Sequence, residues 1–201
     1  MAMSGTTKVL LVAVAAGLLG VGAGLMVNGP GPLLRTEAGQ RALNAAAAAS
    51  APPPPSGVEV ARRGAPVPAV RVAMLGGGTL ALPDDYAGRP VLVNLWASWC
   101  GPCIEEMPEL ERFATAQGAA GTAVVGIALD DEAAVREFLR TVPVSYPIAL
   151  DAAGPADAGV RLGNPKGVLP YTALIDARGR LVKQRIGPFE HGEIDGWARL
   201  D

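Results

Sequence analysis

Apolar residues between positions 69 and 186 fall into short runs that are separated by turn-forming residues. Short apolar runs rich in β-branched and aromatic side chains are typical of buried strands, and longer amphipathic stretches are typical of helices. The strands predicted in this way are 69–75, 79–82, 91–97, 122–129, 146–150, 171–176 and 181–186, and the predicted helices are 104–117, interrupted by Pro108, 130–142 and a short terminal helix within 191–201. Their order, a βαβ unit followed by an antiparallel pair, predicts an α/β domain with a mixed central sheet and helices on both faces.

A separate apolar stretch, 9–27, contains nineteen residues without a charge and follows Lys8. About 20 apolar residues are needed to cross a hydrocarbon core of roughly 30 Å, whereas a cleavable signal has an apolar region of about 7–15 residues with a small-x-small site behind it. We expect an uncleaved signal anchor at 9–27, a single transmembrane helix, with a cleaved signal peptide as the alternative. Lys8 favours residues 1–8 in the cytoplasm, which would place the rest of the chain outside the inner (cytoplasmic) membrane, in the periplasm.

Residues 28–66 have the composition of a tether between this segment and a folded domain at 67–201. The stretch 44–57 reads NAAAAASAPPPPSG and has no hydrophobic period. Its four prolines favour extended polyproline II, a semi-rigid spacer. Residues 33–49 are expected to form a helix in part.

Charge and composition narrow the classes of partner. Hydrophobic residues make up 50% of the chain, but aromatic residues only 4%. Residues 1–66 contain five basic and two acidic side chains, which leaves twelve basic and seventeen acidic ones, a net charge of −5, in 67–201. A domain of that charge without a basic stripe is a poor partner for nucleic acid, and we expect none.

The chain has two cysteines, Cys100 and Cys103 in WASWCGPC, and four kinds of site use a C-x-x-C pair. A zinc site needs four ligands, and besides the cysteines the chain offers one histidine, His191. Covalent haem attachment needs C-x-x-C-H, and Ile104 stands at the histidine position. A structural disulfide would close a very short loop and constrain the unfolded chain little. A reversible dithiol is therefore the favoured interpretation, and the sequence indicates neither a cofactor nor a metal.

The position of the pair gives each sulfur a role. Because the strand 91–97 ends just before the motif and a helix begins at it, Cys100 is expected near the helix N-terminus, where unpaired N–H groups and the helix dipole stabilise a thiolate. Pro102 suits the first helical turn. Cys100 is therefore predicted to be the exposed nucleophile that attacks a substrate disulfide, and Cys103 the buried thiol that resolves the mixed disulfide.

The motif and its surroundings resemble the thioredoxin superfamily. The stretches PDDYAGRPVLVNLWASWCGPCIEEMPEL, VVGIALDD and VLPYTALIDARGRLVKQRIG are together similar to the TlpA-like, membrane-anchored disulfide reductases, a branch that includes the DsbE-type reductases of cytochrome c maturation. The resemblance covers about 135 residues, essentially all of the predicted domain. It implies a thioredoxin fold with an extra N-terminal hairpin, supplied by 69–82, and an insertion, supplied by 130–160.

The same resemblance implies a surface for the substrate. Pro170 in GVLPYT matches the family's cis-proline, which packs beside the dithiol; the alternative is an ordinary trans proline at the start of an edge strand. The backbone of Leu169 would pair with an incoming substrate as an added strand. Trp99 would cover the dithiol and exclude water, which is compatible with plain packing.

An acid near the buried thiol is also implied. Glu106 stands three residues after Cys103, so one helical turn brings it back toward the sulfurs, and in the TlpA-like branch an acid at this place resembles a proton acceptor. The alternative is a solvated glutamate like Glu105 and Glu109. Thioredoxins proper carry a buried aspartate six residues before the first cysteine. This chain has Asn94 there, which cannot ionise, and this favours Glu106 as the proton acceptor.

The dipeptide Gly101-Pro102 between the cysteines is the thioredoxin-type pair, found with reduction potentials of roughly −270 mV, against about −120 mV for the oxidant DsbA. We therefore expect a reductant of protein disulfides, with apocytochrome c among the candidate substrates. Tyr171 stands where DsbE-type reductases often carry a glutamate, which argues against a dedicated cytochrome c role. A reductant outside the cytoplasm needs imported electrons, so a membrane thiol-transfer protein is the expected donor.

Three other functions remain as alternatives. A peroxide reductase of related fold needs a Thr or Ser shortly before a single peroxidatic cysteine, and here only Ser98 is available, with Cys103 too close. A copper chaperone of related fold needs a histidine ligand, for which His191 would have to fold back. A membrane-tethered binding domain would contain an inert disulfide.

Overall fold

The structure is a computed structural model that describes residues 6, 9–13, 16–17, 20, 29 and 31–200. The chain divides into two compact units, residues 1–42 and 43–201. Most of the predicted anchor at 9–27 lies outside the described residues. No helix within the described residues is both long enough and apolar enough to cross a membrane.

Two helices occupy the start of the predicted tether. They are α2 (Gly31–Arg35) and α3 (Glu37–Ala49), so the partial helix expected at 33–49 is present. Thr36 begins α3 as a side-chain cap, because its Oγ1 accepts a hydrogen bond of 3.0 Å from the N–H of Gly39.

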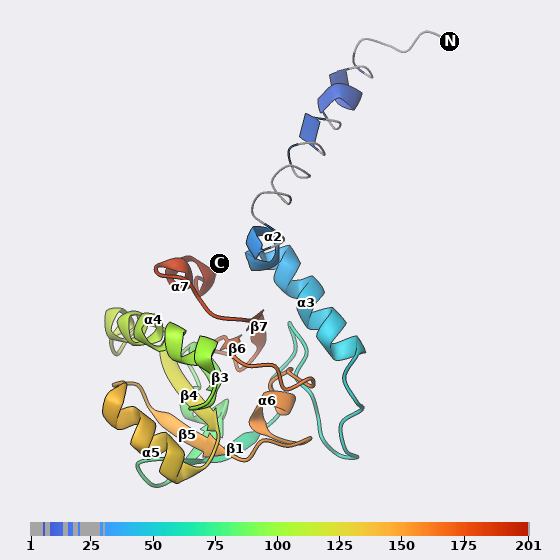
Figure 1. The fold of residues 1–201 in the computed structure, drawn as a ribbon. Helices are drawn as coiled ribbons and strands as arrows, with labels where there is room; N and C mark the ends of the chain where they lie inside the picture. The colour runs from blue at the N-terminus through green and yellow to red at the C-terminus, as the bar shows by residue number, and fades with distance from the viewer. Residues whose placement is uncertain are drawn as a thin grey trace. The chain divides into compact units, whose positions relative to one another are not determined.

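The second unit is built on a seven-stranded mixed sheet with the order β2-β1-β5-β4-β3-β6-β7 (Figure 1). The strands are β1 (Val70–Met74), β2 (Thr79–Leu82), β3 (Val91–Trp96), β4 (Ala123–Leu129), β5 (Ile148–Asp151), β6 (Tyr171–Ile175) and β7 (Leu181–Ile186). Strand β3 pairs in parallel with β4 and antiparallel with β6, and β1 pairs antiparallel with both β2 and β5. The predicted mixed sheet and its N-terminal hairpin are therefore confirmed.

Helices cover the two faces of this sheet unequally. The helices α4 (Gly101–Gln117), α5 (Glu132–Thr141) and α7 (Glu193–Trp197) contribute to one apolar layer, together with Leu92 and Trp96 of β3. The opposite layer contains Val93 and Leu95, and it is covered by the short helix α6 (Ala158–Arg161) and by chain near Ala61 (Figure 1). Alternate β3 residues thus face opposite layers, as the pleat requires.

Three details differ from the sequence-based expectations. Helix α4 runs through Pro108 without interruption, with that residue exposed on the helix surface. Two short helical turns, α6 and Asp84–Tyr86, were not predicted. Packing into the domain begins before residue 67, because Ala61 is buried and its N–H donates to the carbonyl of Arg161 at 2.8 Å.

Candidate active site

The two cysteines lie at the N-terminus of α4 and are joined by a disulfide with a Cα–Cα distance of 5.3 Å. Cys100 is the N-cap residue in an extended conformation, and Pro102 follows in the first turn. The side chains differ in exposure, since Cys100 is 6% exposed and Cys103 is completely buried. Cys100 is therefore the slightly more accessible cysteine, but it is buried and not exposed as the sequence predicted.

The turn between β3 and α4 is held in place by Asp130, at the end of β4. One carboxylate oxygen of Asp130 accepts hydrogen bonds from the N–H of Ser98 at 2.9 Å and from its hydroxyl at 2.6 Å. The hydroxyl that a peroxide-reductase function would use is therefore bonded to a carboxylate.

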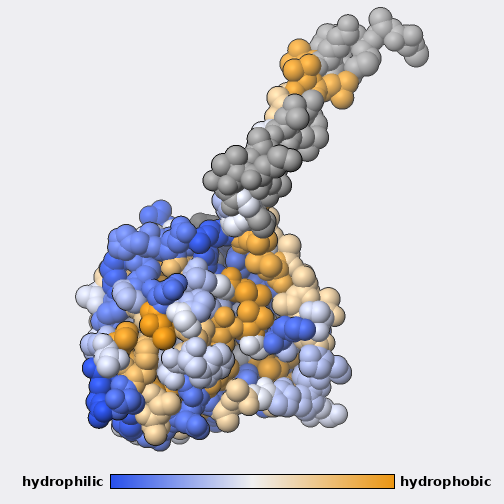
Figure 2. All heavy atoms as spheres, in the orientation of Figure 1, coloured by the Kyte–Doolittle hydropathy of each residue, from blue (hydrophilic) through white to orange (hydrophobic). Residues whose placement is uncertain are grey.

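Trp99 lies in this turn and is 70% exposed. That it covers the dithiol and excludes water stays a prediction. Among the described residues of the second unit, Trp99 and Leu200 are the large apolar side chains with high exposure. On the face of this unit drawn in Figure 2, hydrophilic and hydrophobic residues both reach the surface.

Leu169 and Pro170 belong to the same region as the disulfide. The peptide bond between them is cis, and Pro170 is buried. Leu169 is partly buried against the apolar layer that contains both cysteines. The carbonyl of Pro170 accepts a hydrogen bond of 3.0 Å from Gly187, whereas Leu169 forms no backbone hydrogen bond within the described residues. A segment without internal pairing is available to pair with another strand.

Glu106 is buried on α4, with 1% of its surface exposed, and is not a solvated residue of the helix face. Its Oε1 accepts a hydrogen bond of 2.7 Å from Asn94, and its Oε2 accepts one of 3.0 Å from the N–H of Phe189. Burial raises the pKa of Glu106 from 4.5 to about 7, although the bonds from Asn94 and Phe189 and the nearby Arg185 guanidinium lower it. Glu106 can therefore gain or lose a proton close to neutral pH.

Beneath Glu106, three polar residues form a row across the sheet in an otherwise apolar layer. Asn94 of β3 lies opposite Thr172 of β6, and Thr172 lies opposite Arg185 of β7. All three are buried, and Asn94 also donates to the hydroxyl of Thr172 at 3.2 Å. Sequence reasoning missed Thr172 and Arg185. The one signal was Asn94 itself, because a polar residue inside an apolar strand needs buried partners.

A second glutamate of α4 is also buried, contrary to the expectation that Glu109 is solvated. Glu109 is 6% exposed and forms a bidentate pair with Arg112, and it accepts a hydrogen bond of 2.8 Å from the N–H of Gly192. Its partner Arg112 holds the pKa of this carboxyl below its usual value. His191 lies 3.2 Å from Glu109 and is 87% exposed. Within the described residues no group of three His, Cys, Asp or Glu side chains could hold a metal ion.

A sheet of this topology with a C-x-x-C disulfide where a central strand meets a helix defines a thioredoxin-fold protein. The chain belongs to the Redoxin family, whose family model matches residues 62–197.

A thiol-disulfide oxidoreductase and a thioredoxin-like protein are among the known proteins similar to the chain. The chain is 29% identical over 118 residues to thiol-disulfide oxidoreductase ResA of Bacillus thuringiensis (strain Al Hakam), a match that covers 57% of this chain and 65% of ResA. It is 31% identical over 145 residues to thioredoxin-like protein YneN of Bacillus subtilis (strain 168), covering 70% of this chain and 81% of YneN. A solved DsbF homologue from Corynebacterium diphtheriae matches with a TM-score of 0.59 at 26% identity, covering 72% of this chain and 94% of that one. The match thus spans just under two thirds of the length of ResA.

Proposed function

We propose that the protein is a thiol:disulfide oxidoreductase that reduces protein disulfides. The observation that carries this proposal is the Cys100–Cys103 disulfide at the N-terminus of α4, with Cys100 the more accessible residue and Cys103 fully buried. The similarity to a thiol-disulfide oxidoreductase supports the same activity.

The two sulfurs would act in sequence. In the reduced protein, the Cys100 thiolate is stabilised by the N-terminal end of α4 and attacks one sulfur of a substrate disulfide. A new sulfur–sulfur bond forms, and the substrate's second sulfur leaves as a thiolate. Cys103 then attacks Cys100, which releases the substrate's first sulfur as well. The substrate gains two electrons and two protons, and the protein returns to the observed disulfide.

Glu106 would take the proton of Cys103 during the second step. It lies one helical turn from Cys103 on the buried side of α4, and its pKa of about 7 suits a base that works near neutral pH. A water-exposed glutamate would be a weaker base at neutral pH, because its pKa is near 4.3.

The substrate would dock along Leu169. Its unpaired backbone groups can form main-chain hydrogen bonds with an extended peptide, and the exposed ring of Trp99 offers an apolar contact close to Cys100. The neighbouring Pro170 forms the buried side of this surface.

Sequence features support a proposed direction and location of the reaction. The Gly101-Pro102 dipeptide favours a reductant, and the uncharged stretch 9–27 favours an anchor that places the domain outside the cytoplasmic membrane. The expected electron donor is a membrane thiol-transfer protein. Apocytochrome c is a candidate among the protein disulfides that would be reduced.

Equilibration of the protein with dithiothreitol or glutathione tests this function. A reversible pair gives a defined reduction potential near that of thioredoxin, roughly −270 mV, and catalyses reduction of insulin disulfides. An inert bond that resists dithiothreitol would instead identify a binding domain with a structural disulfide.

A further inference from the structure

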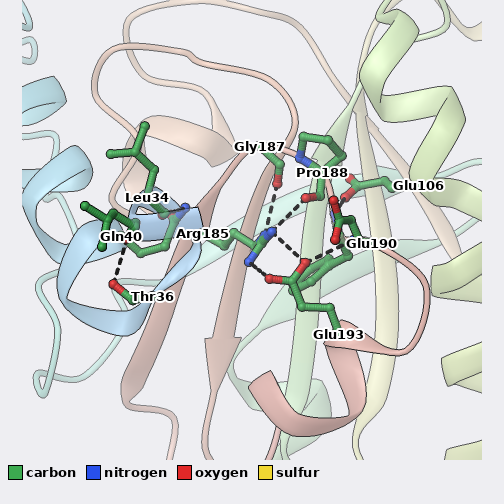
Figure 3. A network of polar contacts seen from close by, with 11 residues as sticks. Leu34, Thr36, Gln40, Glu106, Arg185, Gly187, Pro188, Glu190 and Glu193 are labelled. Carbon is green, nitrogen blue, oxygen red and sulfur yellow. Dashed lines mark hydrogen bonds and ion pairs between the residues drawn. The ribbon is translucent and has the colours of Figure 1, made fainter. Parts of the chain in front are cut away.

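Arg185 is a buried cation of β7 that binds the segment joining β7 to α7. Its guanidinium donates to both carboxylate oxygens of Glu193, at 2.8 and 2.9 Å. The same group donates to the carbonyls of Pro188 at 2.8 Å and Gly187 at 3.3 Å, and it lies 4.5 Å from the ring centre of Phe189. Figure 3 shows the Arg185 guanidinium between Glu193 on one side and the carbonyls of Gly187 and Pro188 on the other.

This segment also carries one of the two hydrogen bonds that reach Glu106. The N–H of Phe189 donates to Glu106 Oε2, while Asn94 binds the other oxygen. Glu193 reinforces the segment, because its Oε2 accepts a hydrogen bond of 3.0 Å from the N–H of Glu190. The position of the Phe189 N–H therefore depends on the contacts that Arg185 and Glu193 make with its neighbours.

We propose that Arg185 and Glu193 are positioning residues, whose ion pair holds the Phe189 N–H against Glu106 and so sets how readily Glu106 accepts a proton from Cys103. The part of this proposal that concerns Cys103 rests on the proposed function. The contact between the segment and Glu106 does not.

The charged and titratable groups around Glu106 come from three elements. Arg185 approaches from β7, Tyr146 from the segment before β5, and Cys103 lies on the same helix, in the disulfide. Burial and the charge of Glu106 raise the pKa of the Tyr146 phenol, which stays neutral. Arg185 is thus the cation that acts on Glu106. A test has to separate the direct effect of its charge on the pKa of Glu106 from its effect on the position of the Phe189 N–H.

Two substitutions separate them. Arg185→Lys keeps the positive charge but loses the planar fork that binds Glu193 and two carbonyls at once. Glu193→Gln removes the counter-charge and leaves Arg185 in place. If charge alone mattered, the first would leave the pKa of Glu106 unchanged and the second would lower it. If position matters, both move the Phe189 N–H away and raise that pKa, by about one unit.

The measurement is NMR of the oxidised full-length protein, with the glutamate side-chain carboxyl carbons and the Phe189 amide followed against pH. In the unsubstituted protein, the Phe189 amide resonance should titrate together with the Glu106 carboxyl. Both substitutions should raise the Glu106 midpoint and uncouple the Phe189 amide from it. The exposed pair Arg136–Glu132 of α5 gives matched controls, Arg136→Lys and Glu132→Gln, which should leave the midpoint unchanged.

An unchanged midpoint in Arg185→Lys together with a lowered one in Glu193→Gln would overturn the proposal. So would a Phe189 amide in the unsubstituted protein that does not follow Glu106, a result that requires no variant to fold. Insulin reduction by the unsubstituted protein is measured separately. Its absence overturns the proposed function and the link to Cys103, whereas the NMR midpoints judge the positioning itself.

Discussion

Asn94 donates a hydrogen bond of 2.7 Å to Glu106 in the buried layer between β3 and α4. No donor among the described residues reaches the carbonyl oxygen of the Asn94 side chain. Because an amide group carries both a donor and an acceptor, Asn94 can turn to accept a hydrogen bond from Glu106 once that carboxyl is protonated. The pair can therefore accommodate both charge states of Glu106, because Asn94 itself carries no charge.

Glu106→Gln should slow release of the mixed disulfide, because the substituted amide cannot take the proton of Cys103. General base catalysis of this kind contributes about 10²–10⁴-fold. In the unsubstituted protein the release rate should rise with pH through a midpoint near 7, where Glu106 loses its own proton, and the substitution should remove this midpoint. Rapid-quench kinetics of a single turnover measure both effects.

Glu105→Gln is the matched control for this experiment, since Glu105 is the exposed neighbour of Glu106 on α4. Its release rate should stay within about twofold of the unsubstituted protein, as expected for a surface substitution. Glu109 is unsuitable because it is buried and paired with Arg112. Equal effects at Glu105 and Glu106 would show that bulk water accepts the proton.

The stability of the oxidised protein should fall as pH rises from about 4.5 to about 7. Burial raises the pKa of Glu106 from 4.5 to about 7, so between these values the folded chain binds more protons than the unfolded chain. The penalty is absent below this range, where the carboxyl is protonated in both states, and complete above it. The full penalty in free energy of unfolding should be about 3 kcal/mol, since one pKa unit corresponds to about 1.36 kcal/mol.

Urea unfolding at several pH values measures this penalty, with Glu106→Gln as the reference that carries no ionisable group at the site. As pH rises across this range, the free energy of unfolding of the unsubstituted protein should fall relative to that of the Glu106→Gln protein. A difference that does not vary with pH would mean that Glu106 keeps an ordinary pKa.

Gly126→Ala should destabilise the domain by about 1–3 kcal/mol, the usual cost of overpacking a core. A Cβ atom at this position of β4 would lie 2.8 Å from Ile148 Cδ1 and 3.0 Å from Trp96 Nε1. Gly196→Ala is the control, because nothing lies within 4 Å of a Cβ there and alanine favours the helix α7. A Gly126→Ala protein as stable as the Gly196→Ala protein, by thermal unfolding, would show that this layer is not tightly packed.

The fold could be predicted because its signals are local. Most of the strands are short runs of apolar or β-branched residues, and the C-x-x-C spacing together with Ile104 and the single histidine favours a reversible pair of Cys100 and Cys103. Glu106 was proposed as the proton acceptor through a resemblance. Its burial, which no local pattern specifies, separates it from Glu105.

The rest of the site depends on contacts between distant parts of the chain. Phe189 and Glu106 are 83 positions apart, and nothing near Phe189 in the sequence indicates that its N–H is needed there. The burial of Arg185 follows from its register opposite Thr172, which becomes known only when β6 and β7 are paired.

The central claim is that Cys100 attacks the substrate and Cys103 resolves the intermediate. The most direct measurement is trapping with the Cys103→Ser protein in its reduced form, challenged with insulin and analysed by non-reducing electrophoresis and peptide mass spectrometry. We predict a long-lived mixed disulfide through Cys100, and no adduct and no insulin reduction with Cys100→Ser. An adduct that forms through Cys103 in the Cys100→Ser protein, or a Cys103 thiol that alkylates faster than Cys100 near neutral pH, would contradict the account.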